Sequence, residues 1–382
     1  MRQDLMQPVV AGALAAFIGF AASFAIVLTG LIAVGANPAQ AASGLGILNL
    51  TTGLCSLYLA LRFRMPIAVA WSTPGAALLA SLAVPDGGYG VAVGAFITSS
   101  VLIVATGMVP AFRRWIQAIP MSLSSAMLAG VLLNICLIPV TSTAANPLIV
   151  GPVIVVWFLI SLKSALWAVP GAVATAAVVM VWGGYWPADL SFQLTHFVWV
   201  TPQFSWAASI SIAIPLFLVT MTSQNLAGMA VLKAFGYAPD LSAALRVTGA
   251  ASVLNGFGGG HHVNLASLTA AMCANPDAAA DPSRRYIAVV AAGIVFIAMG
   301  LSAEVMMQVA AAAPARLIES IAGLALLGAL SGSLVQAYSP ERGREGALVC
   351  FVITASGIAV GGIGSAFWGL VLGGLVYRLK RD

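Results

Sequence analysis

The segment NGFGGGHHVN, residues 255–264, holds four glycines, two adjacent histidines and two asparagines. It lies in a chain of 382 residues of which 61% are hydrophobic and only 7% are charged, with a mean hydropathy of +1.02. Apolar surface on that scale cannot be hidden from water in a soluble globule, so the chain belongs in a membrane. The polar, glycine-rich segment therefore needs an explanation at membrane depth.

Long apolar runs set the fold class. Runs of about 17 to 25 apolar residues recur along the whole chain, which is the length that a bilayer core of about 30 Å requires of a helix. No large polar stretch separates them, so we expect a single all-α integral membrane domain over residues 1–382. The first run lacks an obvious cleavage site and is interpreted as a span that stays attached. Fourteen spans are expected, at 7–33, 43–61, 65–82, 89–111, 117–139, 146–162, 166–183, 207–232, 243–256, 259–275, 286–305, 314–335, 346–360 and 362–378.

The 16 Lys and Arg residues indicate a topology and not a nucleic-acid partner. With fourteen spans and both termini in the cytoplasm, every basic residue except Arg316 falls in or beside an inside loop. The long segment 183–206 contains no Lys or Arg and is rich in aromatic residues, as expected of an outer connection. With twelve spans this parity of the basic residues is harder to keep, so fourteen spans are favoured.

The two halves of the chain resemble each other. IPMSLSSAMLAGVLL (119–133) aligns with the segment that starts at residue 313, and LAGVLL (128–133) matches IAGLAL (321–326) at an offset of about 193 residues. We therefore predict two repeats of seven spans, about 7–183 and 207–379. Because seven is odd, the second repeat is inverted in the membrane. Inverted repeats are a transporter architecture, with the binding site near the bilayer midplane.

The glycines of the opening segment suit an irregular backbone at that depth. Glycine permits an extended or positive-φ backbone, which a membrane tolerates only where protein or a water-filled cavity surrounds it. The following HHVNLASLTAAM has helical apolar spacing, so a half-helix is expected to begin near His261 to Asn264, with its positive end toward the protein centre. The alternative is that the glycines only allow close helix packing, which leaves the polar cluster after them unexplained.

The third span contains a second half-helix start, AWSTPGAALLA (70–80). Ser72 or Thr73 is a natural N-cap, and Pro74 is a natural first helical residue. Two half-helix N-termini that face each other make an anion site. The candidate contacts from these two segments are Ser72, Thr73, Gly75, Gly259, Gly260, His261, His262 and Asn264.

Five motifs carry a family resemblance: SLAVPDGG (81–88), TSQNLAGMAVL (222–232), FGGGHHVNLASLTAAMC (257–273), DPSRRYIAVVAAG (281–293) and GLALLGALSGSL (323–334). Together they resemble the benzoate membrane transport (BenE) family of bacterial benzoate:proton symporters over nearly the whole chain. That family is similar in architecture to the uracil/xanthine permeases and the sulfate permeases, whose seven plus seven inverted spans form a core and a gate domain. The resemblance implies a dimer-prone carrier of the bacterial inner membrane that moves an aromatic carboxylate inward with a proton.

The eighth span supplies a third wall of the expected site. Nucleobase permeases tend to hold an acidic residue at the corresponding position, whereas this chain has Gln224 and Asn225. A fixed negative charge would repel a carboxylate in a low-dielectric pocket, and an amide can donate without that penalty. Gln224, Thr220 and Ser223 are therefore candidate contacts. Hydrogen bonding between helices is the alternative role for each of them.

The ring of an aromatic substrate needs an apolar slot. Phe17, Phe20 and Phe24 lie three and four residues apart on one face of the first span, so they are candidates for that slot. Ordinary packing is the alternative for such a stripe.

Proton coupling requires an ionisable group inside the membrane. The candidates are His261, His262, Glu304 and Glu319. A protonated histidine beside a half-helix N-terminus favours a carboxylate, so proton and anion bind best together. For Glu319 the alternative is an i,i+3 pair with Arg316, and for Glu304 a hydrated helix end.

Competing functions have less support in the sequence. A carrier of sulfate, bicarbonate, a dicarboxylate or a nucleobase would share the half-helices without needing an aromatic slot. A channel requires a continuous polar path, and the spans hold few polar residues. No GxSxG or HExxH motif indicates an enzyme, and no P-loop or dinucleotide fingerprint indicates a cofactor. The four cysteines lie far apart in apolar surroundings without metal-ligand spacing, so no metal is expected.

Overall fold

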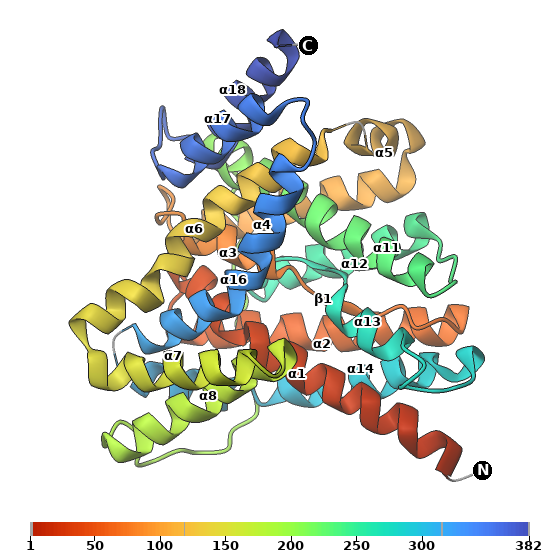
Figure 1. The fold of residues 1–382 in the computed structure, drawn as a ribbon, viewed down its shortest axis with the longest axis vertical. Coiled ribbons are helices and arrows are strands. Elements are labelled where there is room, and N and C mark those ends of the chain that lie inside the picture. The colour runs from red at the N-terminus through yellow and green to blue at the C-terminus, as the bar shows by residue number, and fades with distance from the viewer. Residues whose placement is uncertain (1–2, 118, 315, 381–382) are drawn as a thin grey trace.

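The computed structural model describes residues 3–117, 119–314 and 316–380, and it is mostly helical (Figure 1). Eight helices in this part are long and apolar enough to cross a membrane: Leu5–Ala33, Pro38–Phe63, Tyr89–Met108, Met121–Ala145, Ala165–Trp182, Trp206–Ala234, Pro282–Leu301 and Leu317–Tyr338. Four shorter helices (α7, α12, α17, α18) and two strand–helix pairs complete the expected fourteen segments. The all-α membrane fold is thereby confirmed.

One group of elements forms the core domain. Its first half comprises α1 (Gln3–Ala33), α2 (Pro38–Phe63), β1 (Val69–Trp71), α3 (Thr73–Ala80) and α4 (Tyr89–Met108). Its second half begins with a continuous eighth span built of α9 (Trp206–Ala208), η1 (Ser209–Ala213), α10 (Ile214–Thr220), η2 (Met221–Asn225) and α11 (Leu226–Ala234). It continues with α12 (Leu241–Phe257), β2 (Val263–Leu265), α13 (Leu268–Ala274), η3 (Pro282–Arg284) and α14 (Tyr286–Leu301).

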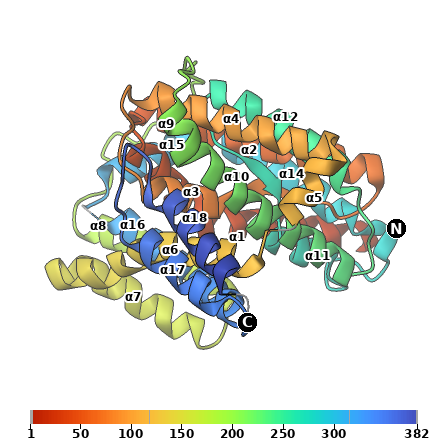
Figure 2. The same cartoon turned by 90° about the horizontal axis from the view of Figure 1, so that it is seen from above.

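The remaining spans form the gate domain: α6 (Met121–Ala145), α7 (Pro147–Ser161), α8 (Ala165–Trp182), α16 (Leu317–Tyr338), α17 (Arg344–Ala355) and α18 (Ser365–Leu379). Helix α6 packs along α16 and α17, and α17 pairs with α18. Viewed from above, α6, α7, α16, α17 and α18 gather on one side, while α2, α11, α12 and α14 lie on the other (Figure 2). Two short helices, α5 (Pro110–Gln117) and α15 (Ala303–Ala312), join core to gate at the same place in each half of the chain.

Glycine allows the core helices to approach closely. A Cβ added to Gly53 of α2 would lie 2.4 Å from the carbonyl oxygen of Gly293 of α14, which no side chain could tolerate. The same two helices meet again where Gly46 lies against Gly300. The core is therefore a tight scaffold around the two half-helices.

Several segment boundaries differ from the sequence-based expectation. The span expected at 117–139 runs from Met121 to Ala145, because Pro120 separates it from α5. The span expected at 286–305 ends at Leu301, and α15 follows as a separate helix. The last two spans are α17 and α18, separated by a glycine-rich loop over 356–364.

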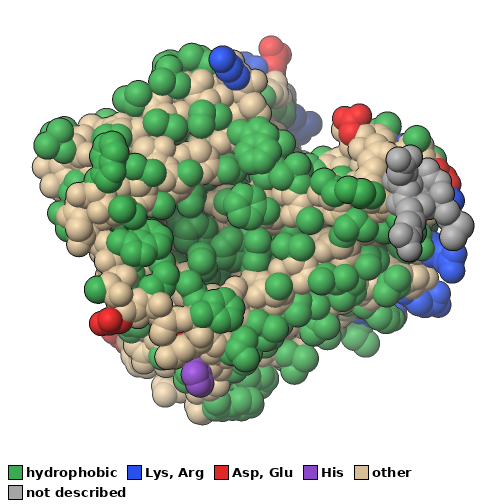
Figure 3. Space-filling view, turned by 90° about the horizontal axis from the view of Figure 1, so that it is seen from below, with side chains coloured by type: hydrophobic (Ala, Val, Ile, Leu, Met, Phe, Trp, Pro, Cys, Tyr) green, Lys and Arg blue, Asp and Glu red, His purple; other side chains and the backbone are tan. Residues whose placement is uncertain are grey.

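The exterior agrees with a lipid-facing protein. On the face shown in Figure 3, Lys and Arg side chains lie at the upper and right-hand margins, with wide apolar surface between them. The connection after α8 runs in an extended conformation and is bonded to the core, because backbone N–H groups of Thr195 and Val200 donate to carbonyl oxygens of Leu301 and Phe257. The sulfur atoms of the four cysteines are free and buried.

Candidate functional site

Two short strands, β1 and β2, pair at the centre of the core, and we call this pair the strand crossing. Strand β1 pairs antiparallel with β2, and Ala70 lies opposite Asn264. A strand this short leaves outward N–H groups that must find partners inside a membrane. Ser56 of α2 accepts from the N–H of Val69 at 3.0 Å, and Ser252 of α12 accepts from Val263 at 2.9 Å. The irregular backbone of the two strands is therefore held by side chains of the surrounding helices.

The half-helix of the second repeat begins later than expected. We predicted a start near His261 to Asn264, but residues 263–265 are strand and α13 begins at Leu268. The glycines instead end α12 in a tight turn, with Gly259 at a φ of +80°. The prediction was wrong because helical apolar spacing does not reveal a three-residue strand that pairs with a distant segment.

Helix α3 begins as predicted, and its first turn is closed. Ser72 is the N-cap, and its Oγ accepts from the N–H of Gly75 at 3.1 Å. The Ser72 carbonyl oxygen accepts from Ala76 at 2.8 Å, and Pro74 has no N–H to offer. Only the N–H of Thr73 is left without a partner in this turn, as far as the described residues show.

Helix α13 begins with an open turn. Its N-cap, Ser267, makes no side-chain capping bond. Within the described residues, the N–H groups of residues 267–270 have no hydrogen-bond partner. These donors lie at the positive end of the short helix.

A cavity of about 480 Å³ lies between core and gate at the ends of both half-helices. This volume falls within the range of roughly 300–1,000 Å³ that small-molecule sites occupy. We call it the central cavity. Its core wall consists of Pro74, Thr222, Ser223, Gln224, Leu226, Ala227, Ala230 and Ser267. Its gate wall consists of Met121, Ser124, Ser125, Leu128, Ala329, Gly332, Ser333 and Gln336.

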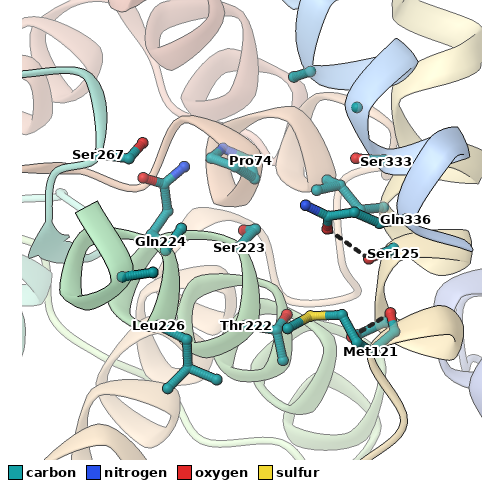
Figure 4. A pocket seen from close by; sticks show the side chains of 16 residues that line it. Pro74, Met121, Ser125, Thr222, Ser223, Gln224, Leu226, Ser267, Ser333 and Gln336 are labelled. Atoms are coloured by element: carbon teal, nitrogen blue, oxygen red, sulfur yellow. Dashed lines mark hydrogen bonds between the residues drawn. The ribbon is translucent and has the colours of Figure 1, made fainter. Parts of the chain in front are cut away.

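The core wall presents neutral donors to this space. The Gln224 amide points into the gap between Ser267 and Pro74 (Figure 4). It lies in η2, a π-helical turn, and such turns recur at functional sites because they re-aim neighbouring side chains. The next residue, Asn225, turns to the strands instead, where its Oδ1 accepts from the N–H of Leu265 at 3.1 Å. None of the described residues that line the central cavity is acidic.

The gate wall holds polar residues that the sequence analysis missed. Ser125 donates to Oε1 of Gln336 at 3.1 Å, which joins α6 to α16 (Figure 4). The short polar runs SLSS (122–125) and SGS (331–333) inside otherwise apolar spans were the available signal.

The two histidines lie behind the strand crossing and outside the central cavity. Both are fully buried. His262 has a hydrogen-bond partner at each ring nitrogen, at 3.4 Å to Thr220 and 3.2 Å to the Phe96 carbonyl oxygen. Neither ring nitrogen of His261 has a partner. Strand β2 separates both histidines from α13. Neither histidine therefore adjoins the N-terminus of α13, although the sequence led us to expect one there.

The other predicted contacts divide between the cavity and the scaffold. Ser223 and Gln224 line the central cavity, whereas Ser72, Thr220 and Asn264 are fully buried behind it. Thr73 and Gly75 form the first turn of α3 next to Pro74. Gly259 and Gly260 pack against α2, and the Gly259 carbonyl oxygen accepts from the Tyr89 hydroxyl.

The phenylalanine stripe does not line the central cavity, so it does not form an apolar slot there. Phe20 and Phe24 stack on each other with ring centroids 5.4 Å apart, and Phe20 packs edge-on against Trp71. Phe17 is 51% exposed on the exterior. The stripe is real, but α1 turns it toward β1 and α14 and away from the cavity.

The two glutamates are also remote from the central cavity. Glu319 lines a second cavity of about 410 Å³, which lies between α1, the end of α3, α15 and the start of α16. Arg316 lines it too, but no ion pair joins these two described residues. The i,i+3 pair that we considered for Glu319 is therefore not formed. Glu304 lies in the first turn of α15.

Comparison with known proteins identifies the family. The family model for the benzoate membrane transport protein (BenE) matches residues 4–379. The chain belongs to the benzoate membrane transport protein family. It is 40% identical over 372 residues to the inner membrane protein YdcO of Escherichia coli K12, covering 96% of this chain and 94% of that one. It is 31% identical over 383 residues to the benzoate membrane transport protein of Acinetobacter baylyi ADP1, covering 99% and 96%.

Solved structures agree with the fold of this family member. The transmembrane domain of a cyanobacterial bicarbonate transporter, BicA, superposes with a TM-score of 0.60 at 14% identity, covering 97% of both chains. SLC26A9 superposes with a TM-score of 0.66 at 13% identity, covering 97% of this chain and 65% of that one. This BenE-family chain is therefore a multi-pass membrane transporter with the inverted-repeat, core-and-gate architecture expected from its sequence.

Proposed function

We propose that this transporter takes up benzoate or a related aromatic carboxylate together with a proton, and that the anion binds in the central cavity. The observation that supports this most is the chemistry of the cavity wall. Hydroxyl and amide groups converge there beside apolar side chains, and no lining side chain is acidic. Neutral donors bind a carboxylate without the repulsion that a fixed negative charge would add.

The two ends of an aromatic carboxylate match two parts of the wall. The carboxylate fits beside Gln224, Ser267 and the end of α3, where amide and hydroxyl hydrogens converge. The ring fits against Leu128 of α6, Leu226 of α11 and Met121. This assigns the apolar slot to the gate wall and to α11, in place of the phenylalanine stripe of α1.

The proton acceptor of this symport is one of the two buried histidines. A symporter needs proton and anion to bind better together than apart. His262 is connected by hydrogen bonds to Thr220, which bonds to Ser72 at the start of α3. Glu304 and Glu319 lie outside the central cavity and are weaker candidates.

The distribution of basic residues supports an orientation with both termini in the cytoplasm of a bacterial inner membrane. In that orientation the central cavity lies in the cytoplasmic half, and the second cavity, with Arg316, lies in the outer half. Movement of the gate domain against the core would then exchange access between the two sides. The homodimer implied by the family resemblance stays a prediction, to be checked by the mass of the purified protein in detergent.

Uptake of labelled benzoate into proteoliposomes tests the proposed function. We expect uptake to rise when an inward proton gradient is imposed and to fall when a protonophore collapses it. Unlabelled aromatic carboxylates should compete, whereas sulfate, bicarbonate, dicarboxylates and uracil should not. No benzoate uptake under any gradient would contradict the proposal, and competition by one of the other solutes would identify the substrate class instead.

A further inference from the structure

A chain of hydrogen bonds runs from the start of α3 to the far side of the core. Ser72 Oγ lies 2.8 Å from Thr220 Oγ1. Thr220 Oγ1 lies 3.4 Å from Nδ1 of His262, and the Nε2 of that ring lies 3.2 Å from the Phe96 carbonyl oxygen. All of the side chains in this series of hydrogen bonds are fully buried. The strands tie the two ends together as well, because the Ser72 N–H donates to the His262 carbonyl oxygen at 3.0 Å.

The partners fix the direction of every hydrogen when the ring is neutral. The Phe96 carbonyl oxygen can only accept, so Nε2 of His262 carries the ring hydrogen and Nδ1 is the acceptor. Thr220 then donates to Nδ1, and Ser72 donates to Thr220. The second role of Ser72 Oγ, accepting from the N–H of Gly75, is compatible with this direction.

We propose that Ser72, Thr220 and His262 form a proton relay, and that its reversal couples proton uptake to binding of the anion in the central cavity. The inference rests on the proposed function and adds which histidine takes the proton and by which route. A hydronium ion at the start of α3 gives a proton to Ser72 Oγ and leaves as water. The original Ser72 hydrogen moves to Thr220 Oγ1, and the original Thr220 hydrogen moves to Nδ1 of His262.

The transfer reverses the direction of the hydrogen bonds between Ser72, Thr220 and His262. One positive charge has entered, and it resides on the imidazolium ring of His262. Nδ1 now donates to Thr220, and Thr220 donates to Ser72. Because Ser72 then accepts from both Thr220 and Gly75, its own new O–H must point away from them. It becomes a free donor at the end of α3, two residues before Pro74, which lines the central cavity. A donor at that end, and a positive charge on His262 behind it, both favour a carboxylate.

The surroundings of His262 leave this charge without a competing counter-ion. His261 faces it, with ring centroids 6.5 Å apart. On α4, the hydroxyl of Tyr89 donates to the Gly259 carbonyl oxygen, and Phe96 offers only its carbonyl group. Among the buried described residues, the one Asp, Glu, Lys or Arg is Arg285, which bonds the carbonyl oxygens of Ala274 and Ala279. The bound anion is then the charge that can stabilise the imidazolium.

His261 differs from His262 in a way that assigns the role. Both of its ring nitrogens lack a partner, so no hydrogen-bonded route leads to it from the start of α3. The relay therefore predicts that His262 and not His261 sets the dependence of benzoate binding on pH.

Benzoate binding to the purified full-length protein, measured over a series of pH values, tests the relay. When one proton binds with the anion, the wild-type affinity rises by up to about tenfold for each pH unit of acidification. Thr220→Val removes the central hydroxyl at nearly constant volume, and its affinity should stay within about twofold across the series, against that tenfold change. Thr248→Val is the matched control, because Thr248 is equally buried and its hydroxyl donates to the Ala244 carbonyl oxygen of its own helix, and it should keep the wild-type slope.

Further variants keep the inference testable if Thr220→Val does not fold. Thr220→Ser restores the hydroxyl and should restore the slope, His262→Gln should abolish it, and His261→Gln should retain it. A wild-type slope in Thr220→Val or His262→Gln would overturn the relay while the proposed function stands. Wild-type binding that ignores pH would also overturn it. A wild-type protein that binds no benzoate at any pH would contradict the proposed function itself.

Discussion

The two half-helices are built alike up to the strand crossing and differ where each helix begins. Ser56 and Ser252, from α2 and α12, support the first strand residues Val69 and Val263 in the same way. After the crossing, Ser72 caps α3 and closes its first turn. Ser267 starts α13 without a capping bond and leaves the N–H groups of its first turn open.

In our proposal, this difference between α3 and α13 separates the response to a proton from the binding of the anion. The closed end of α3 is tied through Ser72 and Thr220 to a buried histidine, so it can respond to a proton. The open end of α13 lies with Ser267 on the wall of the central cavity, so its donors can face an anion. An inverted repeat therefore supplies the same framework twice, and the capping hydrogen bond is formed in one copy, at Ser72, and not in the other, at Ser267.

A substitution of Gln224, which points between the starts of α3 and α13, should have the largest effect on benzoate uptake. Gln224→Glu keeps the shape of the side chain and places a negative charge where we expect the carboxylate, so gradient-driven benzoate uptake should fall by at least about 100-fold. Gln308→Glu is the control, because Gln308 lies on α15 and bonds to Ser191 away from the cavity. Near-normal uptake by Gln224→Glu would show that the anion does not bind between the half-helices.

Asn225 accepts from the second strand, β2, so its loss should show how much that strand depends on a side chain of the eighth span. Asn225→Ala leaves the buried N–H of Leu265 without its acceptor, which should cost about 1–3 kcal/mol of stability. Thermal unfolding in detergent measures this loss. Asn134→Ala is the control, because that side chain bonds to Ala355 in an exposed position. An equal melting temperature for the two variants would show that Asn225 does not hold β2.

Ser72 and Ser267 give the direct comparison of the two helix starts. Ser72→Ala removes a formed cap and should lower stability by about 1 kcal/mol. Ser267→Ala removes no capping bond, so its melting temperature should match that of the wild type. It should instead weaken benzoate binding by about three- to tenfold, the effect of one lost hydrogen bond. The opposite pattern, with Ser267→Ala the less stable variant, would mean that α13 is the capped helix in solution.

Ser223→Ala should have the smallest effect. The Ser223 hydroxyl lines the central cavity but already donates to the Val219 carbonyl oxygen of its own helix, at 2.5 Å. We expect a change in benzoate affinity of less than about threefold, because the group offers only its lone pairs to the cavity. A loss as large as that of Ser267→Ala would place the carboxylate closer to η2 than to α13.

Much of this architecture could be predicted from the sequence, because glycine, proline and charge mark the ends of membrane spans. WSTPG indicated the start of α3 correctly, since Ser72 and Pro74 act through local backbone chemistry. The start of α13 was misplaced, because β2 exists only by pairing with a segment about 194 residues earlier in the chain, where Asn264 lies opposite Ala70.

The candidate site was predictable only in part. Gln224 was found because a neutral amide in an apolar span is chemically distinctive. The packing of the phenylalanine stripe was not predictable, because helical spacing shows that Phe20 and Phe24 share a face but not which neighbour that face meets. Gate residues such as Ser125 and Gln336 reach the site only through the packing of α6 against α16, and a local sequence pattern does not predict that packing.

The position of the bound anion tests the central claim most directly. An experimental structure with para-bromobenzoate would locate the bromine atom by its anomalous signal and the carboxylate by density. We predict the carboxylate between Gln224, Ser267 and the start of α3, with the bromine toward Leu128 of the gate. Density confined to the second cavity beside Arg316, with the central cavity free of ligand, would contradict the account.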